Sequence, residues 1–217
     1  YLYVPYRNQI AEPVYDSAYM IFTTDQLFRT NRFSGFDRIG DTNQLSYALT
    51  TRLLSETSGI ERASLSIGQI AYFAHRKLPL CQSITGQCPD STYVLGYLSP
   101  NSDFSPIATR ASYRFLPKWS LTGDYVFDPT PAATNNGHLD LRYQADVNQI
   151  LSIGYTYLVN GDIVQVSEVP LQRNSLHQAS FSYAWPFSDH WSSLGAINYN
   201  LSKNYQMMSF LGVQYDS

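Results

Sequence analysis

Residues 42–54 constrain the fold most, because apolar and polar side chains alternate along them. The odd positions from Leu45 to Leu53 carry mainly large apolar or aromatic side chains, and the even positions from Gln44 to Arg52 carry small or polar ones. Successive side chains of a β-strand point to opposite faces, so the pattern predicts a strand with one apolar and one polar face. Such a strand fits a soluble β-sandwich, and it also fits a membrane barrel whose apolar face contacts lipid and whose polar face lines a hydrated lumen.

Composition favours the membrane interpretation. Charged residues make up 14% of the 217 residues and aromatic residues 15%, whereas soluble domains average about 25% charged residues. The mean hydropathy of −0.24 is unremarkable, as expected when half of the strand residues face lipid and half face water. The net charge of −3 and the lack of a basic run do not indicate nucleic-acid binding. No stretch approaches the roughly 20 apolar residues of a membrane-spanning helix.

The alternation recurs along the chain, and no segment has convincing helical periodicity. Most of the expected strands approach the roughly 9–11 residues that cross a bilayer at a tilt. About eleven strands are expected, at 1–9, 14–22, 42–54, 60–75, 105–115, 119–128, 138–147, 150–159, 176–185, 191–200 and 206–216.

The connections between these strands are expected to alternate in length. Short turns are expected at 55–59, 116–118, 148–149 and 186–190, and longer loops at 24–41, 76–104, 128–137 and 160–173. Outer-membrane barrels combine short periplasmic turns with longer external loops, and carry aromatic girdles at the membrane interfaces. Phe115 and Trp119, and likewise Trp185 and Trp191, flank short turns. These features favour a membrane barrel over a soluble sandwich.

Four segments resemble one known family: YLYVPYRNQ at 1–9, QLFRTNRFSGFDRIGDTNQLSYALTTRLL at 26–54, ASLSIGQIAYF at 63–73 and FLGVQY at 210–215. They resemble the C-terminal barrel domain of the LptD family of LPS-assembly proteins, also called organic solvent tolerance proteins. The resemblance implies an all-β fold, an antiparallel transmembrane β-barrel, with residues 1–217 as part of a single outer-membrane barrel domain. We therefore expect a fragment that lacks the family's N-terminal periplasmic domain, its seam strands and the cysteine pair that follows LGVQY.

The resemblance also implies a function and a location. It implies a translocon in the outer membrane of a Gram-negative bacterium, which inserts lipopolysaccharide into the outer leaflet through a hydrated lumen and a lateral gate. The implied partners are lipopolysaccharide, an LptE-type lipoprotein plug, and a periplasmic LPS-bridge protein that meets the missing N-terminal domain. A general porin is the alternative, since it shares the strand pattern but would conduct ions through an unplugged lumen. A soluble β-sandwich binding module would need no detergent.

The sequence offers no catalytic constellation. It contains no GxSxG, HExxH or P-loop motif, so we expect neither an enzyme nor a cofactor. The histidines are scattered over different strands and loops, so we expect no metal site. The charged residues on the polar strand faces are the candidate functional set: Arg52, Arg62, Arg110, Arg114, Asp124, Asp140 and Arg142.

Two interpretations of these charged residues remain open. Guanidinium groups match phosphate geometry, so the arginines could contact lipopolysaccharide phosphates or the plug protein. A hydrated, charge-balanced lumen wall is the more general interpretation and the favoured one, with Arg142 paired across strands to Asp140 or Asp124.

Cys81 and Cys88 lie close together in the polar stretch LCQSITGQC. A loop disulfide in an oxidising compartment is favoured over two free thiols, because exposed free thiols are disfavoured outside the cytosol.

Overall fold

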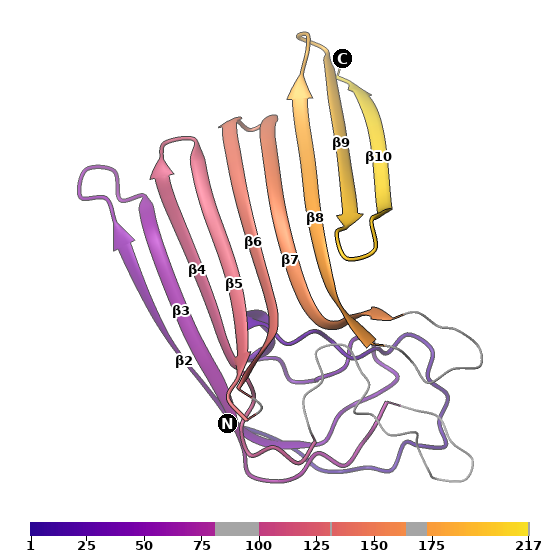
Figure 1. The fold of residues 1–217 in the computed structure, drawn as a ribbon. Helices are drawn as coiled ribbons and strands as arrows, with labels where there is room; N and C mark the ends of the chain where they lie inside the picture. The colour runs from indigo at the N-terminus through magenta and orange to yellow at the C-terminus, as the bar shows by residue number, and fades with distance from the viewer. Residues whose placement is uncertain (81–99, 131, 164–172, 217) are drawn as a thin grey trace.

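The structure is a computed structural model that describes residues 1–80, 100–130, 132–163 and 173–216. In these residues ten strands form one antiparallel sheet, in which each strand pairs with its neighbour in the sequence (Figure 1). The strands are β1 (Leu2–Val4), β2 (Thr42–Leu54), β3 (Glu61–Tyr72), β4 (Ile107–Leu116), β5 (Trp119–Asp128), β6 (Ala133–Asp146), β7 (Gln149–Ile163), β8 (Arg173–Pro186), β9 (Trp191–Asn200) and β10 (Tyr205–Tyr215), and a short 3-10 helix, η1 (Thr24–Gln26), precedes β2. No helix among the described residues is long and apolar enough to cross a membrane.

The sheet has one apolar and one polar face, as the alternation predicts. On the apolar face, Leu121, Leu141 and Ile153 pair in register across β5, β6 and β7. Large apolar side chains on this face are exposed: Leu49 is 72% exposed and Ile153 is 58% exposed. The polar face carries the intervening residues. A monomeric soluble protein rarely exposes so large a continuous apolar surface, so this face requires an apolar environment.

The connections are sorted to the two ends of the sheet (Figure 1). The tight turns that follow β2, β4, β6 and β8 lie together at the upper end in this view, which we call the short-turn end. Residues 5–41 and the described residues that follow β3 lie at the lower end, which we call the long-loop end. The first short turn includes Gly59, whose φ of 65° is a left-handed conformation that favours glycine.

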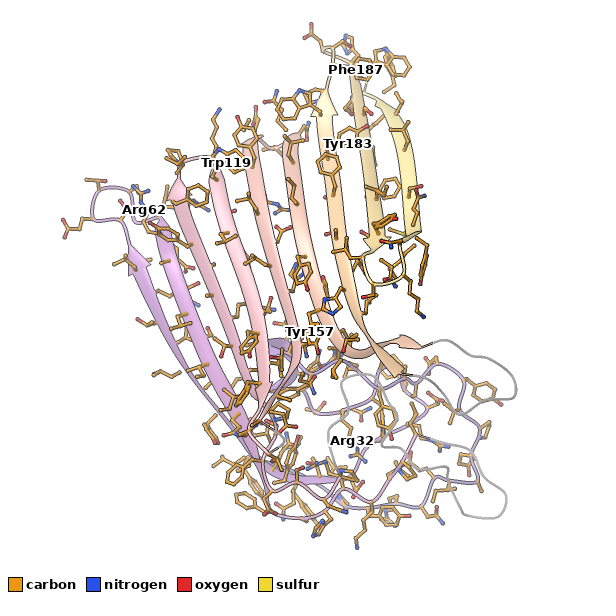
Figure 2. All side chains as sticks on the ribbon, viewed as in Figure 1. Arg32, Arg62, Trp119, Tyr157, Tyr183 and Phe187 are labelled. Carbon is orange, nitrogen blue, oxygen red and sulfur yellow. The ribbon has the colours of Figure 1, made fainter. Side chains whose placement is uncertain are left out.

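Aromatic side chains gather at the short-turn end, where the sequence predicts an interfacial girdle. The rings of Phe115 and Trp119 lie 6.3 Å apart, and Trp119 lies 4.9 Å from Tyr143. Nearer the β10 edge of the sheet, Trp191 lies 5.0 Å from Tyr215. Figure 2 shows Trp119 at the upper end of β5. Amphipathic rings at this height are typical of a membrane–water interface.

The prediction of a strand at 14–22 is wrong. In this stretch the structure has only an isolated bridge between Tyr19 and Phe33. Phe22 is 3% exposed and is buried against the sheet by an irregular segment. The spacing of apolar residues indicates which side chains are buried, but it does not show whether the segment that carries them is a paired strand or a loop. The strand expected at 1–9 is shortened to β1, which ends before Pro5, a residue without a backbone donor.

The connection expected at 128–137 is also shorter than predicted. β6 begins at Ala133, which leaves only residues 129–132 between β5 and β6. Thr134 pairs with Phe127, and Asn136 pairs with Val126. The polar residues of this stretch resemble a loop in composition, but they continue the ladder beyond the apolar part of the strands.

Candidate functional site on the polar face

Residues 5–41, which we call the docked segment, pack onto the polar face near the long-loop end. Phe22 and Leu27 of this segment share one apolar cluster with side chains of β3, β4 and β5. These partners are Ile70, Tyr72, Ala108 and Val126. A Cβ at Gly68 would lie only 2.5 Å from the Leu27 Cδ1 methyl. Glycine at this position therefore lets the docked segment approach the sheet closely.

Arg110 joins the docked segment to the sheet. Its Nε donates to Asp124 Oδ1 of the neighbouring strand at 2.6 Å. Its Nη1 and Nη2 donate to Asp25 Oδ1 and Oδ2 of η1 at 2.7 and 2.8 Å. Because both carboxylate oxygens of Asp25 meet one guanidinium, this is a bidentate, charge-assisted pair. The hydrogen bond from Arg110 lowers the pKa of Asp25 against a smaller opposing effect of burial.

A second set of contacts holds the docked segment in its own shape. The fully buried Arg38 donates to the carbonyl oxygens of Gln9 and Glu12. Arg32, which Figure 2 shows within the long-loop end, pairs with Asp41 at 3.0 Å.

Asp41 also anchors the residues that follow β3. It accepts hydrogen bonds from the backbone N–H groups of Lys77 and Leu78 at 2.7 and 2.9 Å. Burial by itself would raise the pKa of Asp41, but these two bonds and the Arg32 guanidinium outweigh burial and lower it. One carboxylate therefore links the docked segment to the chain beyond β3.

The other predicted residues lie nearer the short-turn end. Arg52 forms an exposed ion pair with Glu61, with an Nε–Oε2 distance of 3.5 Å. Asp140 accepts a hydrogen bond from Ser152. The structure shows no ion pair of Arg142 with Asp140 or Asp124. Asp140 lies two residues from Arg142 on the same strand, β6, and accepts a hydrogen bond from Ser152, whereas Asp124 pairs with Arg110.

Three predicted arginines keep their charges exposed. In the described parts of the chain, Arg62, Arg114 and Arg142 are exposed and take part in no ion pair. Arg142 lies in regular register between Ser120 and Ser152 on the polar face. Arg62 and Arg114 lie beside irregularities in the register of β3 and β4, close to the short turns. Figure 2 shows Arg62 near the upper end of β3.

The docked segment and its acidic contact do not follow from the strand pattern. Asp25 has no periodic signal, and 85 positions separate it from Arg110. A weaker signal lies at 70–73, IAYF, where both strand faces are apolar. On a strand with one polar face, such a break marks a place where the polar face is itself covered.

Two other expectations concern cysteine and metal chemistry. Cys81 and Cys88 lie outside the described residues, so their pairing stays a prediction. Among the residues that the structure does describe, no group of three or more metal-ligating side chains is assembled.

Residues 1–191 match the family model described as "LptD: LPS transport system D". The chain belongs to the LptD family. The family and the antiparallel sheet together establish the predicted fold class, part of a transmembrane β-barrel, with the sheet open within this chain. The apolar face is accordingly the outer, lipid-facing surface of the wall, and the polar face is the inner one.

Curated relatives agree with this family over the whole chain. The LPS-assembly protein LptD of Legionella pneumophila (strain Lens) is 61% identical over 217 residues, covering 100% of this chain and 26% of the relative. The protein of the same name from Pseudomonas aeruginosa (strain LESB58) is 37% identical over 232 residues, covering 100% of this chain and 24% of the relative. The chain thus spans about a quarter of the length of these relatives.

Proposed function

We propose that this protein acts in the outer membrane of a Gram-negative bacterium as a translocon component that inserts lipopolysaccharide into the outer leaflet. The observation that carries the proposal is the match of residues 1–191 to the LPS transport system D family. A polar inner face supports the passage of a sugar headgroup, because polar groups without partners cost several kcal/mol each in hydrocarbon. A lateral gate between strands would pass the acyl chains to lipid.

The proposal includes protein partners. An LptE-type lipoprotein would plug the lumen, and a periplasmic LPS-bridge protein would deliver lipopolysaccharide through an N-terminal periplasmic domain. The docked segment already covers part of the inner face through Leu27 and Asp25. A partly covered inner face favours a plugged translocon over an open porin.

Depletion of the full-length protein in cells tests this function. We expect newly made lipopolysaccharide to accumulate inside the cell and to fail to reach the surface, measured by pulse labelling and surface modification. Normal surface arrival with impaired uptake of small solutes would contradict the proposal and favour a general porin. Steady ion conductance of the purified, plug-bound protein in planar bilayers would support the porin in the same way.

Within this function, we propose that the arginines at the short-turn end bind anionic groups of lipopolysaccharide. Arg114 and Arg142 are exposed and without an ion-pair partner in the described part of the chain, whereas Arg110 already has two carboxylates. Arginine binds phosphate through two parallel N–H···O bonds, and hydrogen bonds to charged groups are worth about 1.5–3 kcal/mol each. A free guanidinium on a hydrated wall keeps this capacity for a passing phosphate.

A double variant of the full-length protein tests the arginine proposal. We expect Arg114→Ala with Arg142→Ala to lower lipopolysaccharide photocrosslinking at the inner face about tenfold, the ratio for roughly 1.4 kcal/mol. The matched control replaces both residues by Lys, which keeps the charge and loses the bidentate fork, and should give an intermediate yield. Unchanged crosslinking would show a merely hydrated wall. Reduced co-purification of the plug with unchanged crosslinking would assign these arginines to the plug instead.

A further inference from the structure

An open groove of about 600 Å³ lies on the outer face across β5, β6 and β7, near the long-loop end. Gly137 of β6 pairs in register with Tyr125 on one side and with Tyr157 on the other. The missing side chain at Gly137 leaves a gap between two aromatic rings. Leu139 and Tyr155 extend the lining of this gap. We call it the tyrosine groove, and Figure 2 shows Tyr157 at the lower part of β7.

The hydroxyl groups around the tyrosine groove already have partners. The oxygen of Tyr125 lies 2.9 Å from Thr134 Oγ1, and that of Tyr157 lies 3.2 Å from Ser175 Oγ. The oxygen of Tyr155 lies 2.7 Å from His177 Nδ1. A molecule in the groove would therefore contact mainly the aromatic rings and would find few free hydrogen-bonding groups. A sugar or a phosphate would find little to bind there, whereas a hydrocarbon chain would not need such groups.

The tyrosine groove is continuous with the lipid-facing surface of the wall. Leu139 is 49% exposed within it, and Ile153 is 58% exposed on the neighbouring strand. Both residues lie on the apolar face that the transmembrane fold presents to lipid. Tyr125 lies three residues before the end of β5, and tyrosine rings are enriched at the height of the lipid headgroups, where the first part of an acyl chain begins. The surface that already contacts lipid thus has a recess at the level where chains enter the bilayer.

We propose that the tyrosine groove holds one acyl chain of a membrane lipid from the leaflet at the long-loop end. The chain lies over Gly137 between the rings of Tyr125 and Tyr157, and so removes apolar surface from a poorly filled recess. It is held longer than the lipids that exchange over the flat parts of the outer face. This inference rests on the transmembrane fold and is independent of what the protein transports.

Photolabelling of the full-length protein tests the proposal. The protein is placed in phosphatidylcholine nanodiscs that contain a small fraction of phosphatidylcholine with a diazirine on one acyl chain, and adducts are mapped by mass spectrometry. We expect adducts at Tyr125, Tyr155 and Tyr157 to exceed those at Tyr47, an exposed tyrosine of β2, by about fivefold, a ratio equivalent to about 1 kcal/mol. Equal labelling of all four tyrosines would overturn the proposal by showing bulk lipid only.

Matched variants locate the bound chain. We expect Gly137→Leu to fill the groove and bring labelling there down to the level at Tyr47. Ala111→Leu adds a large apolar side chain to an exposed position of β4 outside the groove, and should leave labelling unchanged. A Cβ at Gly137 would meet its nearest atoms, Asp124 O and Tyr125 Cδ2, at 3.7 Å, so Gly137→Ala keeps ordinary contacts and should lower labelling only partly. Labelling that persists in a folded Gly137→Leu protein would overturn the proposal.

Discussion

The two ends of the polar face use the same residue type in opposite ways. At the long-loop end, Arg110 is held between Asp25 and Asp124, and the docked segment covers the surrounding wall. At the short-turn end, Arg114 and Arg142 are exposed and, in the described residues, have no ion pair. Alternation placed these positively charged residues on the polar strand positions, but it did not distinguish these environments.

The difference separates a structural arginine from arginines that remain available. Arg110 satisfies its donors within the protein, so an incoming anion would have to displace a carboxylate. The exposed arginines exchange only water when an anion binds. Charge on a lumen wall therefore indicates binding only after the internal partners of each residue are known.

Removing the apolar anchor of the docked segment should have the largest effect. Leu27 is 2% exposed, so Leu27→Ala is expected to lower the free energy of opening of residues 22–27 by about 2–4 kcal/mol. Hydrogen exchange of the full-length protein measures this opening. The neighbouring Phe28 is 66% exposed, and Phe28→Ala should change it by less than about 0.5 kcal/mol. Equal effects of the two variants would show that the segment is not anchored by burial.

Replacing the arginines one at a time should affect the two ends differently. Arg110→Gln leaves the carboxylate of Asp124, whose side chain is 15% exposed, without its charged partner, and it also removes the contact with Asp25 of the docked segment, whose side chain is 63% exposed. We expect the protein to lose about 1–2 kcal/mol of stability, most of it from Asp124. Arg142→Gln removes an exposed charge without an ion pair and should be within about 0.5 kcal/mol of the parent. Chemical denaturation combined with hydrogen exchange measures the change in stability of both variants. A larger loss of stability for Arg142→Gln would reverse the assignment of roles.

Acidification should loosen the docked segment by a smaller amount. The pKa of Asp25 is lowered from 3.8 by Arg110, so the stabilisation is complete above pH 3.8 and is lost as the pH falls through the lower, folded-state pKa. We expect exchange of residues 22–27, corrected for its intrinsic pH dependence, to stay constant from about pH 8 to 5 and to rise below about pH 4. Asp25→Asn should remove that part of the rise. The same rise in the variant would assign the pH dependence to other carboxylates, such as Asp41.

The smallest effect is expected for the ion pair at the short-turn end. The side chains of Arg52 and Glu61 are 67% and 39% exposed, so Arg52→Ala should change stability by less than about 0.5 kcal/mol. Thermal unfolding with and without 0.5 M salt, a concentration that screens exposed charges, measures it. A clear loss of stability would mean that this end is more tightly held than its exposure indicates.

Much of the fold followed from residues whose pattern is local. The strands around Leu49, Leu141 and Ile153 are where alternation predicts them, because the side-chain period of two is a property of each strand alone. The prediction of a strand at 14–22 was wrong because Phe22 belongs to an irregular segment that packs on the sheet. The same apolar residues could be buried from a strand or from a loop. The sequence predicts a loop over the first residues of β6 because asparagine and glycine usually occur in turns. In this protein Asn135, Asn136 and Gly137 are part of the strand.

The local order of residues is enough to predict the two faces of the wall, its aromatic girdle and the residue types that face the lumen. The tertiary structure is needed to show which charges are neutralised, because Asp25 and Arg110 are 85 positions apart and no periodicity relates them. It is likewise needed to show that Gly137 opens a groove, since the gap depends on Tyr125 and Tyr157, which lie on either side of Gly137 in the neighbouring strands. Local patterns fix which way a side chain points, and long-range packing fixes what it meets.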